Sequence, residues 1–488
     1  MLFNSWQFAV FFVIVFFAYY ALPHRFRWML LLAASYYFYM SWNPGLVVLI
    51  SGVTLETYLC GRLLENPARS ARARKWILAV GVSIPLLILF FFKYFNFFTG
   101  AVAEALALVS LPVRSPALNV VLPVGISFYT FQSLAYVIDV YRGDVPVQKH
   151  LGIYALFISF FPQLVAGPIE RSKNLMPQFS EEHQFSGQDA ADGIRLMALG
   201  FFKKLVVADY LSTFVNSVYN DLPDHSGLSL IVATVLFAFQ IYCDFSGYSD
   251  IAIGAARILG FRLMTNFSSP YLSHSIREFW HRWHISLSTW FGDYVYIPLG
   301  GNRVKFPRYC LNLFLTFLLS GLWHGANWTF ILWGALHGAY RIAGALRDHA
   351  RKRRGLAPAA KATGIRGALE VAFTFFLVTV GWVFFRANTL QDAFYVFRHC
   401  FDGIGGSFYQ YLRNGYVGSS FDKGIFIQIV VSLGALFLID ASMKKRDMLR
   451  WLDAQKPVFR WAIYLAFICL IVLLSEKGIA ARFIYFQF

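Results

Sequence analysis

The chain has 488 residues, of which 58% are hydrophobic and 14% are charged, and its formal net charge is +17. This composition excludes a soluble globular protein and indicates a polytopic membrane protein. The basic residues gather in short segments between apolar runs, so we interpret them as topology signals and expect no nucleic-acid partner.

Apolar runs long enough to enter or cross a hydrocarbon core of roughly 30 Å recur along the whole chain. In chain order they cover 7–22, 28–60, 76–100, 118–140, 151–166, 195–218, 228–260, 310–345, 368–386, 425–440 and 460–475. Three of them are each long enough for two helices, so we expect about 11 to 13 transmembrane or re-entrant elements. Because only helices satisfy their own backbone in lipid and no alternating strand pattern occurs, the predicted class is all-α.

The basic segments also predict the orientation of the chain. The first apolar run lacks a basic leader and a small-residue cleavage site, which indicates a retained helix. Positive charges concentrate at 24–27, 69–75, 341–366 and 444–450. The positive-inside rule makes these segments cytoplasmic and places the N-terminus in the periplasm.

The predicted organisation is a single integral-membrane domain over 1–488. N-terminal helices occupy 1–118, a motif-bearing core 119–345, a basic cytoplasmic loop 346–367 and C-terminal helices 368–488. The five cysteines have no paired spacing and lie mostly in or beside apolar runs. We therefore expect neither a disulfide framework nor a metal site.

The segment REFWHRWHISLSTW, 277–290, is the first place where polar groups enter apolar sequence. An ionisable side chain at the bilayer centre costs about 3 kcal/mol or more unless it is paired or hydrated. Helical spacing places Arg277, His281, His284 and Ser288 on one face, away from the tryptophans. An interfacial amphipathic helix and a functional stripe both remain open. HRWH lacks the spacing of a zinc protease motif, so no metal is expected here.

Two further clusters carry polar groups into apolar runs. Asp244 lies one helical turn after Gln240, where it would orient a histidine, pair with an arginine, or form a purely structural buried pair. In GLWHGANW (321–328) and the residue before it, Ser320, His324 and Asn327 share one face of an ideal helix. His324 is either a buried core histidine or a general base in a cavity.

The neighbouring glycines favour close approach in the same segment. Gly321 and Gly325 are spaced four residues apart, which lets a second helix or a ligand approach the backbone.

Five stretches in chain order resemble the membrane-bound O-acyltransferase (MBOAT) family, in its bacterial branch with the alginate O-acetylating subunit and the teichoic acid D-alanyl transferase. They are VLPVGISFYTFQSLAYVIDVYRG (121–143), FPQLVAGPIERS (161–172), QIYCDFSGYSDIAIGAARILG (240–260), FWHRWHISLSTWFGDYVYIPLGGNR (279–303) and GLWHGANWTFILWGALHG (321–338). Together they cover most of 120–340. The resemblance implies tilted transmembrane helices around thinner, partly re-entrant elements and a narrow central tunnel.

The resemblance also assigns roles. The family's catalytic histidine matches His324, as base or acyl relay, and its second prominent histidine matches His284. Its implied oxyanion or orienting groups are Asp244, Ser288, Asn327 and Trp323. Its implied donor or tunnel lining is Arg277, Trp280, Arg282, Trp283, Gly321 and Gly325. His281 departs from the family's FWRRWH pattern, in which arginine is more usual, so no shared role is carried over to it.

The resemblance implies an enzyme of the bacterial inner membrane that transfers an acetyl group. Acetyl-CoA is the expected donor, with no permanently bound cofactor. The expected acceptors are a periplasmic acetyltransferase partner of the SGNH type and an exopolysaccharide such as alginate or cellulose. The rival within the family is D-alanyl or other acyl transfer from a carrier-protein thioester.

The residues also allow a different class. Asp244, His284 and His324 would form a proton relay in a transporter, although no inverted repeat supports this reading. A catalytically silent scaffold of a polysaccharide export complex is the third alternative.

Overall fold

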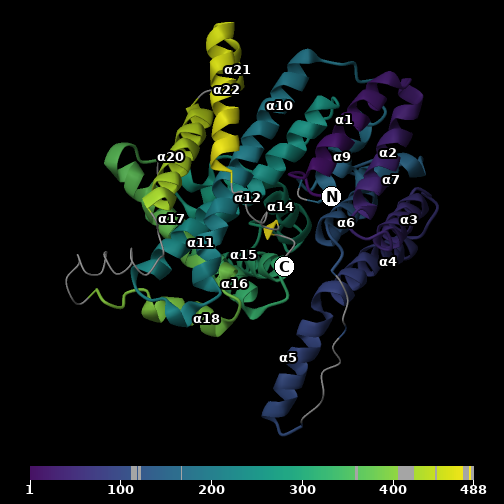
Figure 1. Ribbon diagram of the computed structural model, residues 1–488. Helices are drawn as coiled ribbons and strands as arrows, with labels where there is room; N and C mark the ends of the chain where they lie inside the picture. Colours follow the sequence, from purple (N-terminus) through teal and green to yellow (C-terminus); the bar gives the residue numbers. More distant parts are fainter. Residues whose placement is uncertain are drawn as a thin grey trace. The chain divides into compact units, whose positions relative to one another are not determined.

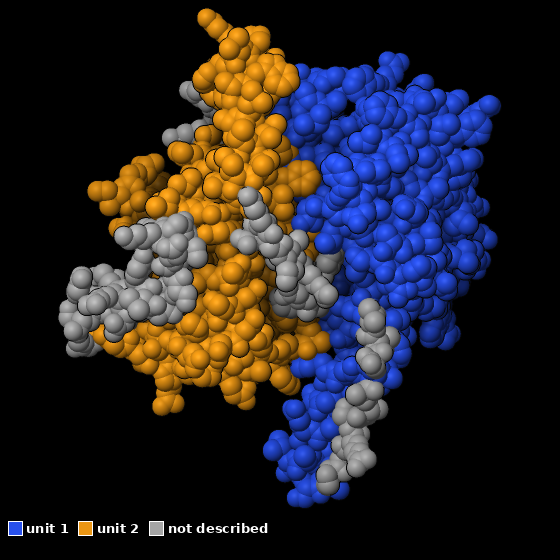
Figure 2. All heavy atoms as spheres, in the orientation of Figure 1, with its two compact units in different colours: residues 1–197, 249–265 blue, residues 198–248, 266–488 orange. Residues whose placement is uncertain are grey.

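The computed structural model describes residues 1–111, 118, 122–165, 167–357, 361–404, 423–445, 448–475 and 483–484. Within these ranges every regular element is a helix, which confirms the predicted all-α class (Figure 1). Two compact units are present. Unit 1 comprises 1–197 with 249–265, and unit 2 comprises 198–248 with 266–488; Figure 2 colours them separately.

Unit 1 consists mainly of the N-terminal helices. They are α1 (Trp6–Ala21), α2 (His24–Met40), α3 (Leu46–Leu64), α4 (Ala71–Leu89), η1 (Phe90–Tyr94), α5 (Phe95–Leu108), α6 (Ile126–Arg142), α7 (Leu151–Ser159), α8 (Phe161–Leu164) and α9 (Ser172–Gln178). The apolar run 28–60 divides into α2 and α3 at a turn where Asn43 Oδ1 accepts a hydrogen bond from the Gly45 backbone N–H at 2.9 Å. Ser70 caps α4 by accepting from the Ala73 N–H at 3.2 Å.

Two long helical segments contribute residues to both units. The first runs without a break through α10 (Gly187–Phe201), the π-helical turn η2 (Phe202–Ala208) and α11 (Asp209–Tyr219). The second is α12 (Leu228–Ile258), a single helix of 31 residues where the sequence also allowed two. Because 78% of the most apolar stretch of α12 is buried, its run of apolar residues reflects packing against protein as much as contact with lipid.

Unit 2 carries the remaining elements. They are η3 (Leu222–Asp224), η4 (Pro270–Leu272), α13 (Ile276–Arg282), α14 (Ile285–Phe291), η5 (Gly292–Tyr296), α15 (Phe306–His324), α16 (Trp328–Arg353), α17 (Gly364–Arg386), α18 (Leu390–His399), α20 (Lys423–Lys445), α21 (Met448–Asp453) and α22 (Pro457–Leu474). Helix α16 continues to Arg353 and α17 begins at Gly364, so both ends of the loop expected at 346–367 are helical and only 354–363 connects the two helices.

Five helical stretches in the described ranges are long and apolar enough to cross a membrane. They are Leu46–Leu64, Ala71–Leu108, Leu228–Ile258, Gly364–Arg386 and Pro457–Leu474. Other expected runs form shorter elements. The run 151–166, for example, contains α7 and α8, of nine and four residues, which are too short to cross. The chain is therefore a multi-pass membrane protein in which several apolar runs do not cross on their own.

Candidate active site

His284 and His324 pack against the same indole in unit 2. The ring centroid of Trp323 lies 6.1 Å from that of His284 and 4.9 Å from that of His324. Both histidines are buried, at 0% and 3% exposure. Residues 40 positions apart in the sequence are thus brought to one place, and Trp323 lies with them.

A break in the chain positions His284. The sequence predicted one helix over 277–290, but α13 ends at Arg282 and α14 begins at Ile285. His284 has φ +43°, a left-handed conformation that costs free energy for a residue with a Cβ. The expected polar stripe is therefore wrong, because Arg277 and His284 do not lie on one continuous helix.

Asn266 stabilises the break. The Ile285 N–H donates to the Asn266 carbonyl at 2.9 Å, and the Ser286 hydroxyl donates to Asn266 Oδ1 at 2.6 Å. Asn266 is fully buried, so these bonds are made away from water. No pattern in the sequence singled out this residue.

The surroundings of His284 are aromatic. Its ring lies edge-on to Phe245 at 4.6 Å and stacks with Phe267 at 6.5 Å. Burial lowers the pKa of His284 to about 3, which keeps the imidazole neutral near pH 7. A neutral ring both donates and accepts a hydrogen bond.

His324 is the last residue of α15. Its ring packs against Trp333 at 4.9 Å and Phe385 at 5.2 Å. The chain then extends through Gly325, and Asn327 caps α16: its Oδ1 accepts from the Thr329 N–H at 3.1 Å and its Nδ2 donates to the Asn388 carbonyl at 2.8 Å. Asn327 therefore does not continue a helical face with His324, and its side chain serves the backbone.

The glycines near His324 hold α15 against α16. A Cβ on Gly321 would lie 2.9 Å from the Cα of Gly334, and one on Gly325 would overlap the Phe330 ring. Both contacts are with α16, and neither glycine lines the cavity described next. The glycines therefore permit close helix packing rather than forming a tunnel wall.

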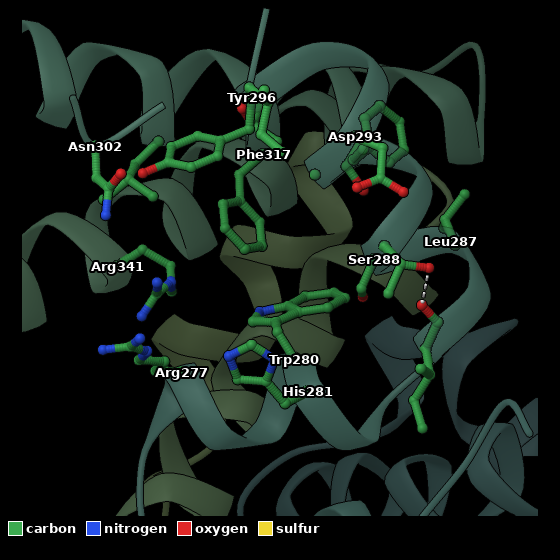
Figure 3. A pocket seen from close by; sticks show the side chains of 18 of the residues that line it. Arg277, Trp280, His281, Leu287, Ser288, Asp293, Tyr296, Asn302, Phe317 and Arg341 are labelled. Carbon is green, nitrogen blue, oxygen red and sulfur yellow. Dashed lines mark hydrogen bonds between the residues drawn. The ribbon is translucent and has the colours of Figure 1, made fainter. Parts of the chain in front are cut away.

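A cavity of about 680 Å³ opens between α13, α14, α15 and α16 (Figure 3). Its lining includes Arg277, Trp280 and Ser288, three of the residues expected near the donor or the oxyanion. It reaches Ile285, the residue after His284, and Ser320, one helical turn before His324. The cavity therefore approaches both histidines without being lined by either.

Besides the two glycines, two more of the residues expected in the lining lie elsewhere. Arg282 pairs with Glu278 at 2.8 Å, and Trp283 is buried in the core against Trp382, with ring centroids 5.0 Å apart. Ser288 does line the cavity, while its hydroxyl donates to the Trp283 carbonyl at 3.2 Å.

Aromatic rings separate the cavity from His324. Trp280 lines the cavity and lies 5.6 Å from Trp333, which in turn packs on His324. A third buried histidine, His337, lies 5.0 Å from Trp333 and was missed from the sequence. The signal was present, because His337 lies one turn after Trp333 in the quoted motif.

Asp244 belongs to a buried ion-pair cluster. Lys204 Nζ lies 2.6 Å from both Asp244 Oδ1 and Asp209 Oδ1, and the Ile484 N–H donates to Asp244 Oδ2 at 2.7 Å. Within the described residues no histidine or arginine contacts the Asp244 carboxylate, so that expectation is corrected. The alternative of a structural buried pair describes the observed contacts, with Lys204 as the partner that the sequence did not reveal.

Comparison with known proteins decides the family. The family pattern described as MBOAT, membrane-bound O-acyltransferase family, matches residues 148–385. The probable alginate O-acetylase AlgI of Pseudomonas aeruginosa is 43% identical over 406 residues, which are 82% of this chain and 75% of the relative. The chain belongs to the membrane-bound O-acyltransferase family. It is a membrane O-acyltransferase.

Other members of the family are related more distantly to this acyltransferase. A peptidoglycan O-acetyltransferase of Helicobacter pylori is 36% identical over 397 residues, covering 75% of this chain and 72% of the relative. The teichoic acid D-alanyltransferase of Bacillus subtilis is 28% identical over 286 residues, which cover 56% of this chain and 71% of the relative. The predicted family and its bacterial branch are thus confirmed, and they favour the acyltransferase over the alternatives of a transporter or a silent scaffold.

Proposed function

We propose that this acyltransferase moves an acetyl group from cytoplasmic acetyl-CoA across the inner membrane to a periplasmic acceptor, and through it to an exopolysaccharide of the alginate or cellulose type. The similarity to an alginate O-acetylase over most of both chains supports an acetyl group and a polysaccharide. The observation that carries the chemistry is the pair of buried histidines on Trp323, next to a cavity with a basic wall.

In the proposed reaction His324 takes the proton of an acceptor hydroxyl as its oxygen attacks the thioester carbon. The new C–O bond forms, the C–S bond breaks, and the proton passes to the departing thiolate. His284, neutral because it is buried, donates a hydrogen bond to the oxyanion that develops on the carbonyl oxygen. The aromatic surroundings strengthen these interactions by excluding water.

The acceptor is proposed to be a periplasmic partner of the SGNH acetyltransferase type, which passes the acetyl group to the polymer. The N-terminus is then periplasmic and the basic segments are cytoplasmic, as the positive-inside rule requires. In this orientation the donor approaches from the side that carries the basic segments.

Labelled acetyl-CoA given to the purified protein in lipid nanodiscs tests the proposal. His324→Ala should lower acetyl release or transfer by about a hundredfold to ten-thousandfold, the usual contribution of a general base. His225→Ala, which removes a histidine from the loop before α12, is the matched control and should keep full activity. Equal activity of His324→Ala and wild type in correctly folded protein would overturn the assignment. A label retained on His324 after denaturation would show a relay rather than a base.

The rival donor is tested in the same assay. Transfer from an acyl carrier-protein thioester, with no use of acetyl-CoA, would replace the proposed donor with the one that the more distant likeness to a teichoic acid D-alanyltransferase suggests.

A further inference from the structure

Two arginines from different helices meet on one wall of the cavity. Arg277 comes from α13 and Arg341 from α16, and Figure 3 shows their guanidinium groups pointing toward each other, with His281 beside them. The side chain of Trp280 continues this wall toward the interior. Three groups that are cationic or can become so therefore face one space.

The nearby carboxylates are engaged elsewhere. Glu278 accepts hydrogen bonds from Arg282 and Lys361, both at 2.8 Å. Figure 3 places Asp293 on the opposite side of the cavity from the two guanidinium groups. Asp348 also acts electrostatically on Arg341, but its carboxylate pairs with Arg347 at 3.6 Å. Across the described ranges, neither Arg277 nor Arg341 makes a hydrogen bond or an ion pair.

Adjacent like charges without a counter-charge are unfavourable, and a bound anion would relieve the repulsion. Guanidinium groups match phosphate in particular, since their planar N–H groups bind its oxygens in pairs. Tyr296 and Tyr309, which line the same cavity, bring hydroxyl groups that suit the same ligand.

We propose that Arg277, Arg341 and His281 form a binding site for a phosphate ester, and we assign that phosphate to the acyl donor. The assignment to the donor rests on the proposed function; the phosphate site itself does not. The chemistry is shared by the phosphate of a phosphopantetheine arm and by a phospholipid headgroup, and the experiment below distinguishes them.

The position of Arg341 suits the donor. Arg341, His337 and Trp333 follow at intervals of four on α16, so they share one face of the helix. Eight residues of helix span roughly 12 Å. The ring of Trp333 then contacts His324, with centroids 4.9 Å apart. An extended arm anchored by its phosphate at Arg341 would therefore direct its thioester toward the Trp280 wall of the cavity, beyond which Trp333 packs on His324.

The test compares 4′-phosphopantetheine with pantetheine, which differ only in the phosphate, in binding to the full-length protein in nanodiscs of zwitterionic lipid. Wild type should bind the phosphorylated form about 10- to 100-fold more tightly, the usual effect of a charge-assisted hydrogen-bonded pair. In the double variant Arg277→Gln/Arg341→Gln this ratio should fall close to one, while pantetheine binding is unchanged. Arg347→Gln removes a charge from the exposed side of the same helix and should leave the ratio as in wild type.

Two more variants keep the test decisive if the double variant does not fold. Arg277 is exposed, so Arg277→Gln alone should fold and lower the ratio in part. Arg341→Lys keeps the charge without the planar fork and should give an intermediate ratio. A ratio that stays at the wild-type value in these folded variants, with no change in the phospholipid that copurifies with the protein, would overturn the site.

The remaining outcomes separate the sources of the phosphate and the two proposals. If the ratio stays at the wild-type value but the variants lack phosphatidylglycerol that copurifies with wild type before reconstitution, a lipid headgroup occupies the site and the donor assignment is wrong. Because the readout is binding, His324→Ala should keep the wild-type ratio. If the binding ratio depends on the two arginines but the protein catalyses no acyl transfer, the proposed function is wrong and the phosphate site is still supported.

Discussion

The indole N–H of Trp280 donates a hydrogen bond to Nδ1 of His337 across 3.3 Å. This bond connects the cavity wall on α13 to a buried side chain of α16. His337 is fully buried, and a Cβ added to Gly381 of α17 would lie 2.8 Å from its Nε2. The position of Trp280 thus depends on packing between three helices.

His337→Ala should lower the affinity for the acyl donor and slow transfer, because Trp280 loses its acceptor and leaves a buried N–H unsatisfied at a cost of about 1 to 3 kcal/mol. His337→Asn should recover much of the loss, since its Oδ1 lies near the position of Nδ1. KM and kcat measured with acetyl-CoA check this. A defect of the same size in both variants would show that the ring volume matters rather than the hydrogen bond.

Gly381→Ala should perturb the same hydrogen bond from α17, without altering any residue that lines the cavity. The added methyl group forces His337 or its helix to shift, which costs about 1 to 3 kcal/mol in a well-packed core. The expected result is a lower thermal unfolding temperature together with a raised KM for the donor. Gly434→Ala on α20, where nothing lies within 4 Å of the added Cβ, is the control: it should leave KM unchanged and should not lower the unfolding temperature.

Lys204→Met should destabilise the protein more than Asp244→Asn. The lysine is a common partner of two buried carboxylates, at 2.6 Å from each, so its removal takes this cation away from both. Removing one partner of a buried ion pair costs about 3 to 5 kcal/mol. Unfolding followed by fluorescence in detergent measures the difference, and a smaller loss for Lys204→Met than for Asp244→Asn would contradict the proposed arrangement.

Gly334→Ala should separate α15 from α16, since the added Cβ would lie 3.0 Å from the Cα of Gly321. We expect a loss of stability of about 1 to 3 kcal/mol and lower transfer activity, because His324 ends α15. Gly344→Ala lies on the same α16 helix with no atom within 4 Å of its Cβ, and should stabilise the helix by up to about 1 kcal/mol. Equal unfolding temperatures for the two variants would rule out the close helix contact.

Affinity for phosphopantetheine should rise as the pH falls from neutrality. Partial burial and the charges of Arg277 and Arg341 lower the pKa of His281 below 6.5, against a smaller opposing effect of Glu278. The ring is therefore neutral at pH 7 and becomes cationic in acid, where a bound phosphate would favour its charge. Without ligand, protonation of His281 has the opposite effect on folding. Because the pKa of His281 is lower in the folded state than in the unfolded state, lowering the pH through 6.5 and below reduces the free energy of unfolding.

His281→Gln provides the comparison, because the titration of the ligand itself cancels between the two proteins. The ratio of wild-type to variant affinity should increase toward low pH, and in His281→Arg the affinity should be high without this dependence. A constant ratio between pH 5 and 8 would show that His281 does not face the phosphate.

Much of the fold follows from local sequence. The runs 368–386 and 460–475 correspond closely to α17 and α22. The thickness of the bilayer sets how many consecutive apolar residues a crossing helix needs, and that number can be counted directly in the sequence. The break at His284 was not predictable in this way. A 3.6-residue period favours one continuous helix. The left-handed conformation of His284 is instead stabilised by Asn266, which lies outside the motif and accepts hydrogen bonds from the residues that follow the break.

The candidate site divides in the same manner. His284 and His324 stood out because polar side chains are rare in apolar sequence and because their motifs are specific to one family. Their shared contact with Trp323, the partnership of Asp244 with Lys204, and the meeting of Arg277 with Arg341 were decided by the tertiary structure. Apolar patterning shows which residues leave water, whereas helix packing decides which of them meet, and that depends on side-chain shapes across the whole core.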